Sequence, residues 1–316
     1  VKYSIKVIAV AKNNKTAEVK KDWKLGSVTE IKQGDITFTL NPSGWTNGNV
    51  TVTAQVKEGI DITGFTLQTS KDGTNYTSTA SQTFTANGTI YARVVDSTEQ
   101  YKGIATRDIE NIDRTKPTIS LTANTTATAN SVILTGKSQD TLSGITAYAW
   151  TDTSVAPTTW TSITRTTSEV TQAITLTTNA TKYFWTKDGS GNTNVASLGV
   201  TNIVAKASIT SYTGITVVAG NSGTPALAYT VSPKLKSFKS SNTAIAAINE
   251  TTGAVTGVAA GTATMTVTLT NYDGTTVSKT CTVTVQTAVA KVGTINYSSI
   301  TNAISAITSG TVTLLV

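Results

Sequence analysis

The sequence of 316 residues predicts an all-β protein made of several small sandwich domains in series. Thr supplies about a fifth of the residues, and Val, Ile and Ala supply most of the apolar content. β-Branched side chains keep few χ1 rotamers and suit a pleated surface, so this composition favours strands. Leu, Glu and Met are scarce, which argues against long helices.

Short runs of alternating apolar and polar residues recur along the chain. Alternation is clear at residues 36–40, 50–56 and 90–94, and polar turn sequences interrupt it at 41–44 and 71–75. Many short strands separated by such turns are typical of sandwiches and barrels. Near the C-terminus, apolar residues between 297 and 307 fall at helical spacing, with Asn296 or Ser298 as the expected cap. This pattern predicts one short helix.

An internal repeat supports the tandem arrangement. Residues 89–96 align with residues 181–188, with Thr, Tyr and Asp at the same offsets, 92 positions apart. That spacing is about one sandwich domain. Residues 111–119 contain Pro117, which restricts the backbone to extended geometry and marks an interdomain joint.

These signals divide the chain into five expected segments, of which the middle three are complete domains. The boundaries are 1–34 for the C-terminal part of a preceding domain, 35–116, 117–206 and 207–286 for the complete domains, and 287–316 for the start of a further domain.

The sequence resembles the tandem bacterial Ig-like domains of surface proteins. The resemblance lies in residues 45–53 (WTNGNVTVT), 72–76 (DGTNY), 87–93 (NGTIYAR) and the joint 112–119 (IDRTKPTI). Residues 207–286 resemble the group 2 bacterial Ig-like domain of intimin-type adhesins. That likeness is carried by residues 240–246 (SSNTAIA) and 253–264 (GAVTGVAAGTAT), with Phe238 where family members often have Trp.

The resemblance implies tandem immunoglobulin-like β-sandwiches in an extended array, with a short helix near the C-terminus. The opening segment resembles the end of an Ig-like or fibronectin III-like domain. Residues 287–316 are similar to the entry of a parallel β-helix.

Residue types needed for common catalytic sites are missing from the sequence. The chain has no histidine and a single cysteine, Cys281, so His-based triads, His-based zinc sites and cysteine clusters are excluded. We therefore expect no enzyme activity and no catalytic or cofactor-binding residues. Cys281 lies in an alternating apolar run and is expected on a buried strand face. The net charge of +7 comes from scattered lysines rather than a basic patch with aromatics, so no nucleic acid partner is expected. No apolar run is long enough for membrane insertion of this segment.

Two kinds of ligand site are candidates. Asp96, Asp113 and Asp188 fall at predicted domain ends, where carboxylate oxygens suit calcium; the alternative is that Asp simply favours turns. Trp160 lies in a loop-like segment and is a candidate for stacking on glycans. Core packing is the alternative for the tryptophans, and we favour it for Trp150 and Trp185.

We therefore expect a structural stalk or spacer of a bacterial extracellular surface protein, of adhesin, cell-wall or S-layer type. Such a stalk holds a distal functional domain away from the surface. Host or cell-surface glycans or proteins, and neighbouring copies of the chain, are the expected partners. Two alternatives stay open: a phage virion fibre or decoration protein, and a carbohydrate-binding accessory region of a secreted polysaccharide-active enzyme.

Overall fold

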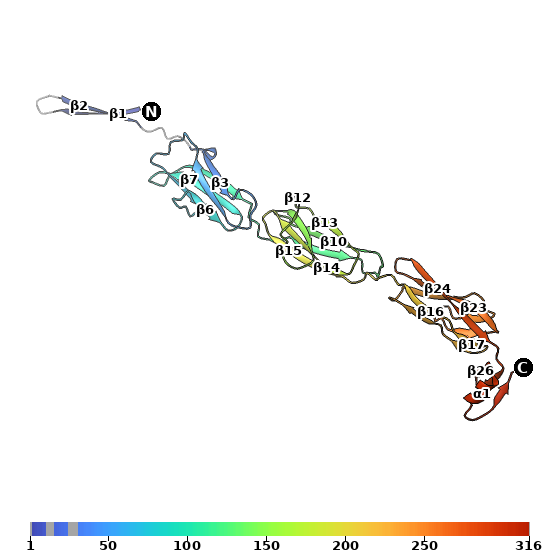
Figure 1. The fold of residues 1–316 in the computed structure, drawn as a ribbon. Helices are drawn as coiled ribbons and strands as arrows, with labels where there is room; N and C mark the ends of the chain where they lie inside the picture. Colours follow the sequence, from blue (N-terminus) through green and yellow to red (C-terminus); the bar gives the residue numbers. More distant parts are fainter. Residues whose placement is uncertain (1, 11–15, 25–30, 316) are drawn as a thin grey trace.

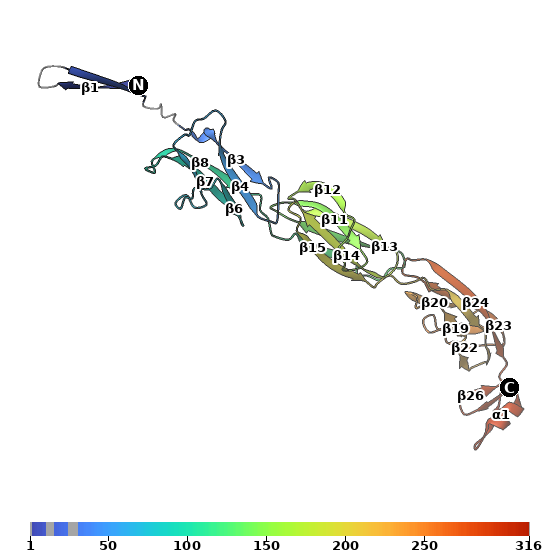
Figure 2. The same cartoon turned by 60° about the vertical axis from the view of Figure 1, so that its left-hand side comes forward.

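The computed structural model describes residues 2–10, 16–24 and 31–315. Its strands form a series of β-sandwiches that follow one another end to end, and two views show the series as elongated (Figures 1 and 2). This confirms the predicted fold class. The first two strands, β1 (Lys2–Val10) and β2 (Thr16–Lys24), pair antiparallel as a hairpin. No helix in the described residues is long and apolar enough to cross a membrane.

The first sandwich follows a short 3-10 turn, η1 (Gln33–Asp35), and packs two three-stranded sheets. One sheet has the order β3-β4-β6 and the other β5-β7-β8. Alternate residues of these strands point inward, and Val50, Val52 and Ile90 are fully buried between the sheets. The strands are β3 (Ile36–Asn41), β4 (Val50–Val56), β5 (Thr66–Ser70), β6 (Ser81–Phe84), β7 (Gly88–Val95) and β8 (Tyr101–Ile109).

The second sandwich pairs a three-stranded sheet, β13-β10-β9, with a four-stranded sheet, β12-β11-β14-β15. Phe184 is its largest fully buried side chain, and Trp150 packs on it with ring centroids 4.6 Å apart. The strands are β9 (Thr118–Ala123), β10 (Val132–Gln139), β11 (Ile145–Thr151), β12 (Thr161–Thr166), β13 (Val170–Leu176), β14 (Ala180–Asp188) and β15 (Thr193–Val200). The two aligned repeats of the sequence fall on β7 and β14, which hold equivalent central places in their sheets.

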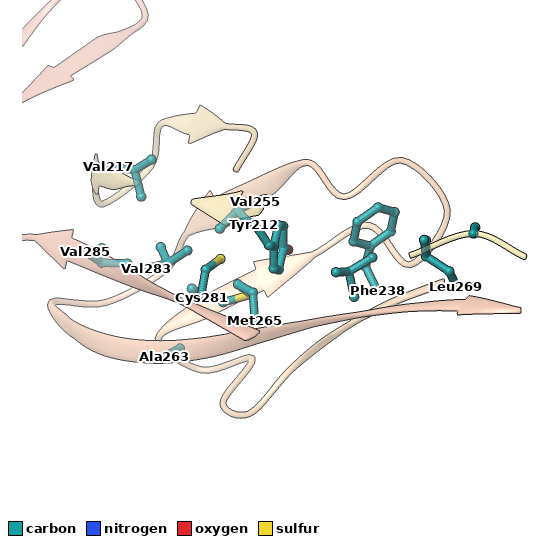
Figure 3. Packing of buried hydrophobic residues seen from close by; sticks show 13 residues of the cluster. Tyr212, Val217, Phe238, Val255, Ala263, Met265, Leu269, Cys281, Val283 and Val285 are labelled. Atoms are coloured by element: carbon teal, nitrogen blue, oxygen red, sulfur yellow. The ribbon is translucent and has the colours of Figure 1, made fainter. Parts of the chain in front are cut away.

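The third sandwich contains the sheets β16-β19, β17-β24-β23-β20 and β18-β22-β21. Its core gathers side chains from several strands, including Met265 and Val283 (Figure 3). Cys281 is buried in this core, which confirms the prediction from its alternating run. The strands are β16 (Ile209–Thr213), β17 (Thr216–Val218), β18 (Ser222–Gly223), β19 (Ala226–Tyr229), β20 (Leu235–Ser240), β21 (Ala246–Ile248), β22 (Val255–Gly257), β23 (Gly261–Thr270) and β24 (Thr276–Gln286).

The C-terminal segment forms a small sheet of order β26-β25-β27 with one helix. The elements are β25 (Ala290–Val292), β26 (Ile295–Tyr297), α1 (Ile300–Ala306) and β27 (Val312–Leu314). The helix is the predicted one, but Ser299 caps it instead of Asn296 or Ser298, because its side chain accepts the amide of Asn302. The three strands pair antiparallel, whereas coils of a parallel β-helix pair parallel, so residues 290–314 show none of that stacking. The five predicted domain boundaries stay predictions.

The exit segment of each sandwich pairs in parallel with a segment near its entry. Thr46 pairs with Ile112 in the first sandwich and Thr128 pairs with Ile203 in the second. In the third sandwich, β17 pairs in parallel with β24. Because the paired segments run in the same direction, the chain enters each sandwich at one end of the pair and leaves it at the other end.

An asparagine side chain clasps the exit segment in the first two sandwiches. Asn87 donates its Nδ2 to the carbonyl of Ile112 at 2.9 Å and accepts the amide of the same residue at 2.9 Å. Asn179 does the same for Ile203, at 3.0 and 2.9 Å. Each clasp therefore adds two hydrogen bonds to a segment that otherwise has one bridging residue.

Candidate cation site at the first joint

Three buried aspartates meet where the first sandwich joins the second. We call this place the first joint; it comprises residues 110–117 with the turns 140–144 and 188–192. One carboxylate oxygen from each of Asp113, Asp140 and Asp188 lies within 4.8 Å of the others. Asp113 belongs to the exit segment of the first sandwich, whereas Asp140 follows β10 and Asp188 ends β14 in the second. The cluster therefore spans both sandwiches.

Backbone pairing brings the two turns of the second sandwich together. β11 and β14 are neighbours, and Ile145 pairs with Asp188, so the turn before β11 lies beside the turn after β14. Asp113 is fixed from the other side, because its amide donates to the carbonyl of Thr46 at 2.9 Å. Its carboxylate crosses the joint, with Oδ2 accepting the amide of Ser143 at 3.2 Å.

Most carboxylate oxygens of the cluster accept backbone amides. Oδ1 of Asp140 accepts the amide of Gly144 at 2.8 Å, and Oδ1 of Asp188 accepts the amide of Asn192 at 2.8 Å. The hydrogen bonds that Asp140 accepts among the described residues, from the amides of Leu142 and Gly144, both end on Oδ1 and leave Oδ2 available. One oxygen of the cluster is therefore free to accept a further ligand.

Ionising all three carboxylates at once is unfavourable, because they lie close together and are buried. Asp113, Asp140 and Asp188 are 1%, 5% and 2% exposed, so water screens them little. Burial raises the pKa of Asp188 above its ordinary value; hydrogen bonds from Asn192 oppose this rise, and the charges of Asp113 and Asp140 add to it. The guanidinium of Arg165 lies nearby, but its Nη1 donates to the carbonyl of Ser143 at 3.0 Å and not to a carboxylate.

Two serine hydroxyls in the same turns lack partners. Ser143 is fully buried and Ser190 is 8% exposed, and the Oγ atoms of both have no hydrogen-bond partner in the structure. The backbone amides of these serines bond Asp113 and Asp188, respectively, so both residues border the cluster. An unsatisfied buried hydroxyl costs free energy, which an added ligand would recover.

This set of groups matches one class of ligand. Carboxylate and hydroxyl oxygens without nitrogen or sulfur are the donors that hard divalent cations prefer, and Ca²⁺ takes 6–8 oxygens in flexible geometry. Two of the three predicted residues, Asp113 and Asp188, are in the cluster. Asp140 was missed by sequence reasoning. Its only signal was its position directly after a strand and four residues before Gly144.

Asp96 lies away from the cluster, although it is the repeat partner of Asp188. Both residues begin a five-residue turn, with Asp96 N donating to Gln100 O and Asp188 N donating to Asn192 O. Oδ1 of Asp96 accepts the amide and hydroxyl of Thr98. The turn of Asp96 precedes β8, whose far end leads to the first joint, so Asp96 is at the opposite end of its sandwich. The turn-forming alternative fits Asp96.

The three tryptophans of the second sandwich are partly or fully buried. Trp160 is partly buried, and the Nζ of Lys187 lies 4.4 Å from its ring centroid, so one face is occupied. Trp150 packs in the core as predicted. Trp185 is 8% exposed, but it neighbours Phe184 on β14 and therefore faces the other side of the sheet, where its Nε1 donates to Thr151 Oγ1 at 3.2 Å. The glycan role of Trp160 stays a prediction.

No family model and no curated protein matches the chain. Solved structures do match at low identity. A C-terminal fragment of intimin in complex with the intimin-binding domain of its translocated receptor is 18% identical, with 55% of this chain and 67% of that chain covered and a TM-score of 0.28. The Escherichia coli adhesin FdeC is 15% identical, with 79% and 96% covered and a TM-score of 0.34. A 1.5-MDa bacterial ice-binding adhesin is 14% identical, with 81% and 99% covered and a TM-score of 0.40.

Proposed function

We propose that this chain is a structural stalk or spacer region of a bacterial extracellular surface protein, which holds a distal domain away from the surface. The role is structural rather than catalytic. The observation that carries the proposal is the parallel pairing of entry and exit segments in all three sandwiches, within an elongated end-to-end series (Figures 1 and 2).

The pairing matters because of how tension reaches each sandwich. A pull on the two chain ends draws the paired segments past one another along their length. All the hydrogen bonds between them then carry load together, instead of breaking one at a time. In the third sandwich the pair extends over residues Thr216–Val218 and their partners in β24. In the first two, the asparagine clasps add hydrogen bonds to the same exit segment.

Short joints with specific contacts also suit a spacer. At the first joint, Asn192 Nδ2 donates to the carbonyl of Asp113 at 3.0 Å, and Arg165 approaches the ring of Trp45 at 6.0 Å. After the third sandwich, Asn221 and Asn296 exchange two hydrogen bonds, at 2.8 and 3.0 Å. Such contacts limit the directions in which neighbouring units can bend.

Small-angle X-ray scattering of the purified chain tests this role. A stalk requires a skewed pair-distance distribution with a long tail, typical of a rod. A symmetric distribution with a radius of gyration near that of a compact protein of this length, about 20 Å, would refute the stalk proposal.

A further inference from the structure

We infer that the first joint binds one Ca²⁺ ion between two sandwiches. At the next joint Lys206 pairs with Asp273, so that joint needs no metal. Calcium would then stiffen one joint of the series and leave the other unchanged. This inference goes beyond the proposed stalk role and does not depend on it, because a cation could bridge these two sandwiches in a protein of any function.

The ligands come from both sides of the first joint. Asp113 arrives from the first sandwich, and Asp140 and Asp188 arrive from the second. The hydrogen bonds that Asp140 accepts among the described residues all end on its Oδ1, which leaves Oδ2 available. The buried Oγ atoms of Ser143 and Ser190 are unpartnered, and the amides of the same two residues bond the carboxylates of the cluster. A cation would neutralise part of the buried charge and give these oxygens a partner.

The second joint, residues 201–208 with the turn 271–275, has the same backbone plan, with neutral side chains at the positions equivalent to Asp113 and Asp188. Val204 replaces Asp113, because its amide donates to Thr128 O at 2.7 Å as the amide of Asp113 donates to Thr46 O. Asn271 replaces Asp188, because its amide donates to Thr275 O across a five-residue turn of the same kind. The turn thus forms without an aspartate at its first position, so turn geometry alone does not require the acid at the first joint.

A fixed positive charge is present at the second joint. Lys206 Nζ lies 2.6 Å from Oδ2 of Asp273, whose side chain is only 4% exposed. Asn271 Oδ1 accepts the amide of Ala207 at 2.8 Å and ties the linker to the third sandwich. The chain therefore supplies its own cation here, whereas no lysine or arginine among the described residues forms an ion pair with the cluster at the first joint.

Calorimetric titration of the metal-free chain with CaCl₂ tests binding directly. We expect one Ca²⁺ per chain and at least a tenfold loss of affinity in Asp140→Asn. This substitution keeps the Oδ1 acceptor of the turn and replaces only the free Oδ2. The matched control is Asp96→Asn. Asp96 holds the same turn position in the first sandwich that Asp188 holds in the second, and this variant should bind calcium like the unmodified chain. A second variant, Ser143→Ala, should fold and bind calcium more weakly.

Trypsin cleavage reports on the joints within the same molecule. Arg114 lies in the first joint and Lys206 in the second, and both are exposed. Calcium should slow cleavage after Arg114 at least severalfold and leave the rate after Lys206 unchanged, which also controls for effects of calcium on the protease. The inference would be overturned by an absence of saturable binding up to about 10 mM, beyond the range of extracellular calcium modules. Equal affinity in Asp140→Asn, or equal slowing of both cleavages, would overturn it as well.

Discussion

The clasp made by Asn179 offers a quantitative test of how the exit segments are held. Replacing Asn179 by Ala removes the donor to Ile203 O and the acceptor of Ile203 N, at 3.0 and 2.9 Å. A neutral hydrogen bond contributes about 0.5–1.5 kcal/mol net, and water can partly replace this pair because Asn179 is exposed. We therefore expect Asn179→Ala to lower the free energy of unfolding of the second sandwich by about 1–2 kcal/mol.

Urea unfolding followed by tryptophan fluorescence measures this loss. Trp150, Trp160 and Trp185 lie in the second sandwich, and the third sandwich has no tryptophan, so the signal is dominated by the relevant unit. With a slope of about 1–1.5 kcal/mol per M for a unit of this size, the midpoint should fall by about 1 M. The matched control is Asn130→Ala, an exposed residue of the same sandwich whose side chain makes no hydrogen bond in the structure. Equal midpoints for Asn179→Ala and Asn130→Ala would refute the clasp.

Two further predictions concern the core and the second joint. A Cβ on Gly136 would lie 2.7 Å from the ring of Phe184, so Gly136→Ala should destabilise the second sandwich by about 1–3 kcal/mol in the same urea assay, and an unchanged midpoint would contradict this packing. A hydrogen bond from Lys206 is the largest cause that lowers the pKa of Asp273 from 3.8 to about 2. The lowered pKa stabilises the fold above pH 3.8, and this stability is lost as the pH falls towards 2. The melting temperature of the unmodified chain should therefore exceed that of Asp273→Asn at pH 6, and the gap should narrow as the pH falls from 3.8 through about 2. Calorimetry showing a constant gap would exclude the ion pair as the source.

The strand content and much of the core could be predicted from the sequence, because alternation directly reports which side chains face inward. Val50 and Val52 alternate with polar residues and are fully buried. The burial of Cys281 followed from the same rule. Trp185 shows where the rule is incomplete, since a residue can be buried on the outer face of a sheet when other side chains cover it.

The candidate cation site could be predicted only in part, because it depends on which turns lie at the same end of a sandwich. Asp113 and Asp188 stand at recognisable positions, one in the joint and one at the end of a repeated strand. Asp140 joins them only through the pairing of β11 with β14, and this pairing is a long-range contact that no local pattern specifies. Asp96 has the local pattern of Asp188, but it lies at the other end of its own sandwich. The sequence repeat thus predicted that Asp96 and Asp188 begin similar turns. The strand pairing, which no local pattern specifies, determines which other residues lie beside each turn.

The central claim is that separate sandwiches, each closed by a parallel pair of end segments, carry load in series. Single-molecule stretching of the whole chain between its ends tests it most directly. Each sandwich has about 80 residues, which extend to roughly 28 nm at about 3.5 Å per residue, less a few nanometres for the folded length. The structure predicts three separate unfolding events of about 25 nm each. Asn179→Ala should lower the force at which the second sandwich unfolds. Extension along a smooth curve without three discrete events, or one event releasing all three sandwiches, would contradict the account.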